Sequence, residues 1–384
     1  MDFSTTHYLN YFMSNFNILF TPLAGSTFIN YFKVLKQGHF TKKHRFKVFM
    51  TTLIVILSTP FHIWEWLYFK IRLSGYKMKK PPLFILGHWR SGTTLLHNMM
   101  CAAPDAGYLT TYQSVFANNM ASQLIYKTFM RILTPERRPS DNIKLDVDYP
   151  QEDEFAFCNM NPNGYYNFFT YPLNYDRFYK RSVHFEGLTE NEIKTWYSDY
   201  DLMLKKAIIN TKGNRLIIKN PVNTGRIKQL LKLYPDAKFL YIYRNPITVF
   251  LSTHRFFVSL MPTLYFHDVD NDFIDNMIFD IYKRIMNDYL EQKSLIPEKN
   301  LLEIRYEDFE KQPVEYMKNI YNDLLDEDFE KIRHYFSDYF SSVKEHKKNK
   351  YEIDASIIER IKKEFGKYME IYNYEVPEEI VIKN

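Results

Sequence analysis

The strongest chemical signal in this sequence is a polar loop between an apolar run and a helical segment. The loop runs from Gly87 to Thr94 (GHWRSGTT) and directly follows residues 83–86 (LFIL). A loop in this position offers backbone N–H groups and the positive end of a helix to an anion, and Gly92 allows a close backbone approach. Its side chains add one cation and three hydroxyl donors: Arg90, Ser91, Thr93 and Thr94. The segment therefore predicts a phosphate-binding loop.

The spacing of this loop follows the pattern of P-loop nucleotide enzymes, G-x-x-x-x-G-K-[ST], except at one position. The lysine that contacts the β- and γ-phosphates is replaced by Thr93, and a cation stands earlier, at Arg90. A triphosphatase would lose its main γ-phosphate contact through this change. A donor with a single 5′-phosphate that carries a transferable group would not need that lysine.

A second anion site is predicted where the apolar residues 238–243 (KFLYIY) end. Asn245 suits a helix N-cap and Pro246 suits the first helical position, so a helix should begin here. Arg244 then lies beside a helix N-terminus, and Ser252 lies on the same helix face. These two side chains are candidates to bind a second phosphate. An arginine that only caps a strand end is the alternative interpretation.

Short apolar runs, each followed by a helical segment, must position these residues. The runs are 83–86, 216–219, 238–243 and 301–306. Continuous apolar strands that alternate with helices indicate an α/β fold with a P-loop-like parallel sheet flanked by helices. Ligands bind beyond the carboxyl ends of such strands, where the polar residues of interest fall. We expect a helical extension over residues 1–80 and one domain over residues 81–384, with a large insertion at 104–214.

The two motifs resemble those of the PAPS-dependent sulfotransferases, in particular the bacterial branch (PAPS is 3′-phosphoadenosine-5′-phosphosulfate). Residues 90–94 (RSGTT) resemble the 5′-phosphosulfate loop of that family, and residues 243–252 resemble its 3′-phosphate site. Residues 305–309 (RYEDF) are similar to its later strand, and residues 216–227 (LIIKNPVNTGRI) to a segment common in bacterial members. The resemblance spans about residues 82–351. It implies a sulfotransferase that uses PAPS, releases PAP and requires no metal.

The resemblance also implies a role for each matching residue. Arg90 would contact the 5′-phosphate and the sulfonate, within the loop of Ser91, Gly92, Thr93 and Thr94. Arg244 and Ser252 would bind the 3′-phosphate, Tyr306 would lie near the adenine, and Lys219 would face the sulfonate. The cytosolic branch closes over the nucleotide with a Gly-rich basic segment that is missing here. Lys348, in the basic run 345–351, is a candidate replacement, with a solvated charged surface as the alternative.

The proton acceptor is the least defined part of the predicted site. The cytosolic branch has a catalytic histidine two residues after the lysine that matches Lys219, but here that position is Pro221. The acidic cluster of Glu152 and Glu154 in the insertion offers a carboxylate base, with Glu152 preferred. Acids are also common in the first turn of any helix. His88 and His97 are the remaining alternatives.

The acceptor is predicted to be a small molecule with a hydroxyl group. Aromatic residues make up 17% of the chain and are dense in the insertion. Apolar pockets of this kind favour an apolar alcohol such as a sterol, a lipid or a phenol. A carbohydrate acceptor is the first alternative, and a P-loop kinase-like enzyme is the second. The net charge of +5 is too small to indicate nucleic-acid binding.

Residues 49–69 are a candidate for membrane contact because they are strongly apolar and are flanked by basic residues. Their uninterrupted apolar core is much shorter than the about 20 residues of a spanning helix. We favour a pair of buried helices joined at Pro60 over a helix that lies in the membrane interface, and a spanning helix is the least favoured. With two cysteines and no signal-peptide pattern, the expected compartment is the cytoplasm, with peripheral membrane association left open.

Overall fold

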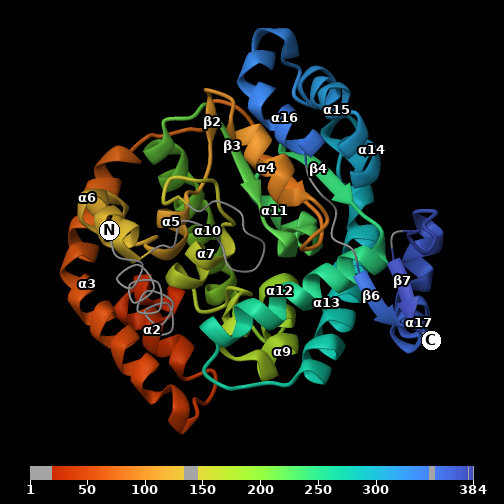
Figure 1. The fold of residues 1–384 in the computed structure, drawn as a ribbon. Coiled ribbons are helices and arrows are strands. Elements are labelled where there is room, and N and C mark those ends of the chain that lie inside the picture. The colour runs from red at the N-terminus through yellow and green to blue at the C-terminus, as the bar shows by residue number, and fades with distance from the viewer. Residues whose placement is uncertain (1–19, 134–145, 346–350, 379, 384) are drawn as a thin grey trace, which may run out of the picture. The chain divides into compact units, whose positions relative to one another are not determined.

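The computed structural model describes residues 20–133, 146–345, 351–378 and 380–383 (Figure 1). The chain divides into two compact units, each of which is treated by itself. Unit 1 consists of Met1–Met78, Gly107–Lys212 and Val258–Asp270, and unit 2 of Lys79–Ala106, Gly213–Phe257 and Asn271–Asn384. The N-terminal extension and most of the predicted insertion therefore fall in the same unit.

The central element of unit 2 is a five-stranded sheet in the order β2-β3-β1-β4-β5. The strands are β1 (Leu83–Leu86), β2 (Ala106–Gly107), β3 (Arg215–Lys219), β4 (Lys238–Tyr243) and β5 (Leu301–Arg305). Parallel pairing joins β1 to β3 and to β4, and β4 to β5. Every residue of β1 and β3 is buried. The predicted α/β class is confirmed, and each predicted strand is present.

Helices follow the strands as the apolar runs predict (Figure 1). After β1 comes α4 (Thr93–Cys101), which packs against β1 and β3. A helical turn (Pro221–Gly225) and α11 (Ile227–Leu233) follow β3, and α12 (Pro246–Leu264) follows β4. The amide of Ile247 donates to the side chain of Asn245 (3.0 Å), which is the predicted N-cap. The remaining helices are α13 (Asn271–Gln292), α14 (Tyr306–Lys311), α15 (Pro313–Asn319), α16 (Ser337–Glu345) and α17 (Ala355–Ile371).

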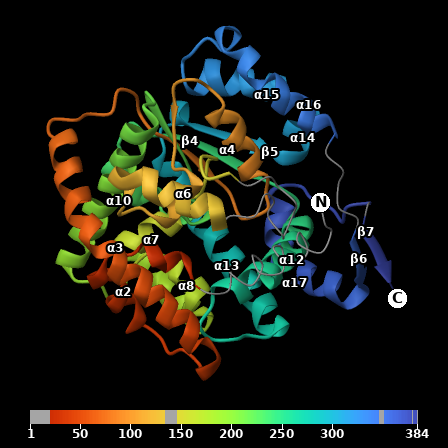
Figure 2. The ribbon, with the colours of Figure 1, turned by 60° about the vertical axis from the view of Figure 1, so that its left-hand side comes forward.

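A small parallel strand pair near the C-terminus was not predicted. It joins β6 (Tyr351–Asp354) to β7 (Ile380–Lys383), on either side of α17. Figure 2 shows the pair at the end of α17. The strands are short and separated by a helix, so neither carries a hydrophobic period long enough to identify from sequence.

Unit 1 is helical within its described residues. Its main elements are α2 (Phe28–Leu35), α3 (Arg45–Arg72), α5 (Thr111–Val115), α6 (Gln123–Leu133), α7 (Glu154–Met160), α8 (Asn167–Thr170), α9 (Tyr175–Tyr179) and α10 (Glu190–Thr211). An apolar cluster of Tyr112, Phe116, Tyr126 and Met130 packs against α3 through Phe61. The polar side chain of Asn159 crosses the interior and donates to the carbonyls of Pro22 (2.9 Å) and Val115 (2.8 Å).

The expected pair of buried helices joined at Pro60 is wrong on two points. Residues 45–72 form one continuous helix with Pro60 inside it, and much of its apolar surface is exposed. Proline removes one backbone donor, which usually kinks or ends a helix. Here Ser58 before the proline and Glu65 after it are both buried, so packing on the two sides of Pro60 holds the helix in one piece. Pro60 itself faces outward.

Candidate active site

The predicted phosphate loop has a backbone shape that suits an anion. Arg90 and Gly92 adopt left-handed conformations (φ 66° and 98°), which turn the chain sharply before α4 begins at Thr93. The amide and hydroxyl of Ser91 donate to the carbonyl of His88 (3.3 and 2.8 Å), closing this turn. The first N–H groups of a helix have no carbonyl partner within it. The N-terminus of α4 therefore supports the loop with donors and a positive dipole end.

Gly92 is packed against the ring of Tyr306, the first residue of α14. A β-carbon added at Gly92 would lie 2.2 Å from a ring carbon of Tyr306. Glycine is thus required both by the close contact and by the positive φ. Burial raises the pKa of Tyr306 to about 12, against the opposing charge of Arg244, so its hydroxyl stays protonated. The resemblance implies that Tyr306 lies near the adenine of the nucleotide. In the structure its ring packs against Gly92 of the phosphate loop.

Two cations predicted to bind different phosphates lie close together in unit 2. The Nε of Arg90 donates to the hydroxyl of Ser252 on α12 (2.8 Å). Nη1 of Arg244 is 3.4 Å from the carbonyl oxygen of Arg90, and its guanidinium lies 4.2 Å from the ring centre of Tyr306. The loop after β1, the turn after β4 and the start of α14 after β5 therefore meet at one edge of the sheet. This arrangement gathers two guanidinium groups and the hydroxyl of Ser252 beside the predicted phosphate loop.

Lys219 lies at the same edge, at the end of β3. It is buried, and its Nζ is 3.4 Å from the hydroxyl of Thr94 on the first turn of α4. The pairing of β1 with β3 sets Lys219 opposite Ile85, just before the phosphate loop. The structure therefore brings Lys219 to the first turn of the helix that follows the phosphate loop.

The two histidines considered as bases are buried in unit 2. Burial, with the charge of Lys219 adding to it, lowers the pKa of His97 to about 3, and burial lowers that of His88 to about 4. Nε2 of His97 lies 3.4 Å from the carbonyl oxygen of Ile217 on β3. An imidazole whose conjugate acid is this strong accepts a proton poorly at neutral pH. The geometry favours structural roles for both rings.

Sequence reasoning missed the residues that hold the start of α12. The carboxylate of Glu307 accepts hydrogen bonds from the amide of Asn245 (3.2 Å) and the hydroxyl of Tyr374 (2.6 Å). The side-chain amide of Asn245 donates to the carbonyl of Glu375 (2.7 Å). The C-terminal residues after α17 thus contact the turn that bears Arg244. Lys348, the predicted closing residue, lies outside the described residues.

The acidic cluster in unit 1 contains carboxylates in contrasting surroundings. Glu154 begins α7, is fully buried and accepts a hydrogen bond from the amide of Tyr165. Asp153 is also buried and accepts from the hydroxyl of Tyr200 (2.5 Å). Glu152 is partly exposed and accepts from the hydroxyl of Tyr166. The cluster does head a helix, as predicted, and Glu152 is its most accessible carboxylate.

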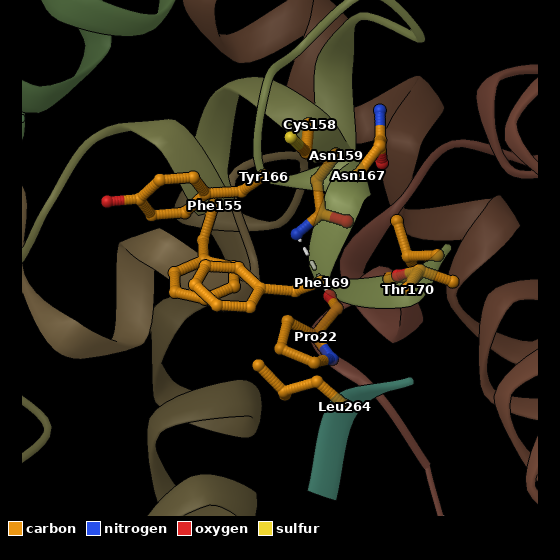
Figure 3. A pocket seen from close by; sticks show the side chains of 10 residues that line it. Pro22, Phe155, Cys158, Asn159, Tyr166, Asn167, Phe169, Thr170 and Leu264 are labelled. Carbon is orange, nitrogen blue, oxygen red and sulfur yellow. Dashed lines mark hydrogen bonds between the residues drawn. The ribbon is translucent and has the colours of Figure 1, made fainter. Parts of the chain in front are cut away.

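A small apolar pocket in unit 1 borders this cluster through Tyr166 (Figure 3). The rings of Phe155, Tyr166 and Phe169 gather on one side of it, near Pro22 and Leu264. The space in this pocket that is open to the centre of a water molecule is about 10 Å³, so an acceptor would enter only if these side chains moved. The sequence predicted apolar aromatic surface in this region but not the hydrogen bond that links it to Glu152.

Among the described residues, no group of three or more His, Cys, Asp or Glu side chains is placed to hold a metal ion.

Comparison with known proteins identifies the fold. The structure is similar to sulfotransferase STF9 from Mycobacterium avium, with a TM-score of 0.63 and 16% identity over 90% of each chain. It is also similar to sulfotransferase STF1 from Mycobacterium tuberculosis, with a TM-score of 0.60 and 15% identity over 88% of this chain and 90% of that one. At these identities the likeness concerns the fold.

Sequence comparison identifies the family. The chain is 26% identical over 359 residues to the omega-hydroxy-beta-dihydromenaquinone-9 sulfotransferase Stf3 of Mycobacterium bovis, covering 92% of this chain and 91% of that protein. The Stf3 protein of Mycobacterium tuberculosis matches to the same extent. Residues 81–331 match the model of the sulfotransferase family, which decides against the kinase-like alternative. This enzyme therefore belongs to the sulfotransferase family.

Proposed function

We propose that the enzyme transfers the sulfonate group of PAPS to the hydroxyl group of a lipid alcohol. The family implies PAPS as the donor. The observation that carries the assignment of the donor site is the meeting of Arg90, Ser252 and Arg244 around the loop at Gly92. These groups provide cations for two phosphates, and PAPS carries a 3′-phosphate that ATP lacks.

We propose a role for each of these residues. The loop N–H groups and Arg90 bind the 5′-phosphate, and Arg244 with Ser252 binds the 3′-phosphate. Lys219 stabilises the sulfonate oxygens as charge shifts onto the leaving phosphate. The acceptor oxygen forms a bond to sulfur while the bond from sulfur to the 5′-phosphate oxygen breaks, and PAP leaves with that electron pair. Such a transfer depends mainly on position and on fixed positive charge.

The acceptor's proton passes to Glu152 in this proposal. Its partial exposure and its contact with the Tyr166 hydroxyl support this choice over the fully buried Glu154. A tyrosine that donates to the carboxylate fixes the orientation of the base before it accepts a proton. Glu154 would then be a positioning residue, which holds the start of α7 through the amide of Tyr165.

Two observations support a lipid alcohol over a carbohydrate. The Stf3 relatives are named for a hydroxylated menaquinone, which is an apolar lipid alcohol. In this chain, the pocket beside Tyr166 has an aromatic and apolar side formed by Phe155, Phe169 and Leu264, although Asn159, Asn167 and Thr170 also line it.

The test is a panel of acceptors with isotope-labelled PAPS. Each acceptor is supplied in the same detergent: a long-chain isoprenoid alcohol, a sterol, a simple phenol and a sugar. We expect transfer to the isoprenoid alcohol with a kcat/KM at least tenfold above that of the other acceptors. Transfer to the sugar alone would refute the lipid assignment. If none of the four acceptors raised PAP release above background, the assignment of the donor site would be refuted.

A further inference from the structure

Helix α3 exposes many large apolar side chains, whereas four of its seven buried residues are polar or charged. A helix on the surface of a soluble protein normally buries its apolar side. The exposed apolar residues of α3 are Phe46, Phe49, Leu53, Ile56, Leu57, Ile63, Trp64, Trp66, Leu67 and Ile71. Ile63 and Ile71 are 72% and 70% exposed. The inward residues include Lys47, Thr51, Ser58 and Glu65, all buried.

The inward side of α3 is fixed to unit 1 along its length. Near its start, the Nζ of Lys47 donates to the carbonyl of Thr263 (3.2 Å). Near its end, Glu65 pairs with the buried Lys206 of α10 and accepts from the amide of Ala121 (2.6 Å). Because these polar contacts fix the inward side of α3 to unit 1, only the outward side is exposed to solvent or to a binding partner.

The charges on α3 favour an anionic partner. Within residues 45–72 the one acidic side chain is Glu65, which faces inward, whereas both ends are basic. Arg45 begins the helix, and Lys70 and Arg72 lie in its last turn. A second copy of the chain packed along this face would bring basic ends near basic ends. A leaflet with anionic headgroups satisfies the ends and takes up the apolar stripe between them.

Neighbouring α6 adds to the apolar surface. It packs on α3 through the rings of Tyr126 and Phe61, whose centres are 5.6 Å apart. On its open side Leu124 is 81% exposed and Ile132 is 67% exposed. Surface of this kind over neighbouring helices exceeds what scattered apolar residues explain.

We infer that α3 lies in the plane of a membrane, with its apolar stripe in the outer part of the hydrocarbon region and its basic ends at anionic headgroups. With 28 residues the helix is about 42 Å long, so it offers an extended contact. A spanning arrangement would surround the helix with lipid and strip Lys47 and Glu65 of their protein partners at a high cost. The inference rests on α3 itself and holds for any acceptor.

The test measures binding of the purified full-length protein to vesicles. One set contains phosphatidylcholine alone, and the other contains phosphatidylcholine and phosphatidylglycerol in a 3:1 ratio. We expect binding to both sets, with about tenfold higher affinity for the anionic vesicles at low salt. If the protein bound neither set of vesicles, the inference would be overturned.

The tryptophans of the chain report on the orientation of α3. Trp64 and Trp66 are exposed on α3, whereas Trp89 and Trp196, the other two, are buried. Lipids brominated near the headgroup end of the acyl chain should quench the fluorescence, and those brominated near the chain end should quench less. The double variant Trp64→Phe/Trp66→Phe should lose this quenching. Equal quenching at every depth would indicate a spanning helix and overturn an interfacial position.

A charge variant tests the stripe. The triple variant Phe49→Glu/Leu57→Glu/Ile63→Glu should lose vesicle binding by at least 30-fold while its thermal midpoint stays within a few degrees. The matched control is Leu295→Glu, an exposed leucine outside α3, which should bind like wild type. Unchanged vesicle binding by the triple variant would overturn the inference. So would a wild-type dimer in light scattering that the triple variant converts to a monomer, since a second copy would then occupy the stripe.

Residues 1–19 give a further control because they precede α2 and are rich in aromatic side chains. A variant that starts at residue 20 should bind vesicles as wild type does. Binding that appears only after this truncation would show that the chain's own N-terminus occupies the stripe, and would overturn a constitutive membrane contact. Turnover with a detergent-soluble acceptor should be unaffected by the triple variant, so failure of this inference and failure of the proposed function are separately visible.

Discussion

Arg244 should distinguish PAP from AMP, because the two ligands differ only in the 3′-phosphate that this side chain is proposed to bind. In the structure its guanidinium lies 4.2 Å from the ring centre of Tyr306, and Nη1 is 3.4 Å from the carbonyl oxygen of Arg90. Replacing it with alanine removes a charge-assisted contact with the ligand. Such a loss costs about 2–4 kcal/mol, which corresponds to an affinity about 30- to 700-fold lower.

Removal of Arg244 also removes its contact with Tyr306, so the PAP measurement alone would mix two effects. AMP separates them, since it binds the same loop and ring but lacks the 3′-phosphate. Titration calorimetry with both ligands, on wild type and on Arg244→Ala, completes a double cycle. We expect PAP affinity to fall by the full factor and AMP affinity to fall by less than about threefold.

The matched control is Arg284→Ala. Arg284 lies on α13 in the same unit, and its Nε donates to Asp280 (2.7 Å). It should bind both ligands as wild type does. Equal affinity of wild type for PAP and AMP, or an equal loss of both ligands in Arg244→Ala, would refute the assignment of the 3′-phosphate site.

Five further substitutions test the remaining roles. Arg90→Ala and Lys219→Ala should lower kcat by at least about 10²-fold while PAP affinity changes little for Lys219→Ala, because PAP lacks the sulfonate; near-normal turnover in both would place the reacting group elsewhere. Glu152→Gln should lower kcat by about 10² or more without loss of fold or PAP binding, whereas Glu154→Gln should mainly lower the thermal midpoint; the pH–rate profiles of both variants decide which carboxylate is the base. Gly92→Ala should destabilise unit 2 by about 1–3 kcal/mol and abolish PAP binding, because its methyl group would lie 2.2 Å from a tyrosine ring carbon; wild-type stability in urea denaturation would contradict this.

Much of unit 2 was predictable because β1, β3 and most of β4 are buried on both faces. Such strands appear in sequence as short continuous apolar runs, and Lys238–Tyr243 matches its predicted bounds in full. The edge at which ligand residues gather follows from parallel topology alone. Which side chains meet there does not, because contacts such as Arg90 with Ser252 join residues 162 positions apart.

The error at α3 concerns environment rather than local pattern. The apolar stripe of α3 has a helical period, but sequence alone does not say which side of a helix faces the protein. We assigned its apolar side inward by default, whereas the polar partners Lys206 and Thr263 lie on other segments. In the acidic cluster, residue type made Glu152 and Glu154 both candidates for the base, with Glu152 preferred, and this assignment stays a prediction. Burial separates them, and burial depends on the tertiary packing of Tyr165 and Tyr166.

The buried ion pair between Glu65 and Lys206 determines which side of α3 packs against unit 1 during folding. A helix with one apolar side could gain burial by rolling half a turn about its axis, which would hide its stripe and remove the exposed surface. That rolled state would leave Lys206 buried without a counter-charge, and burial already lowers the pKa of this lysine against the opposing effect of Glu65. Removing one partner of a buried pair typically costs about 3–5 kcal/mol. The ion pair therefore selects the observed orientation of α3. It contributes less to the net stability of the fold than to the free-energy difference between this orientation and the rolled one, which hydrophobic burial would otherwise favour.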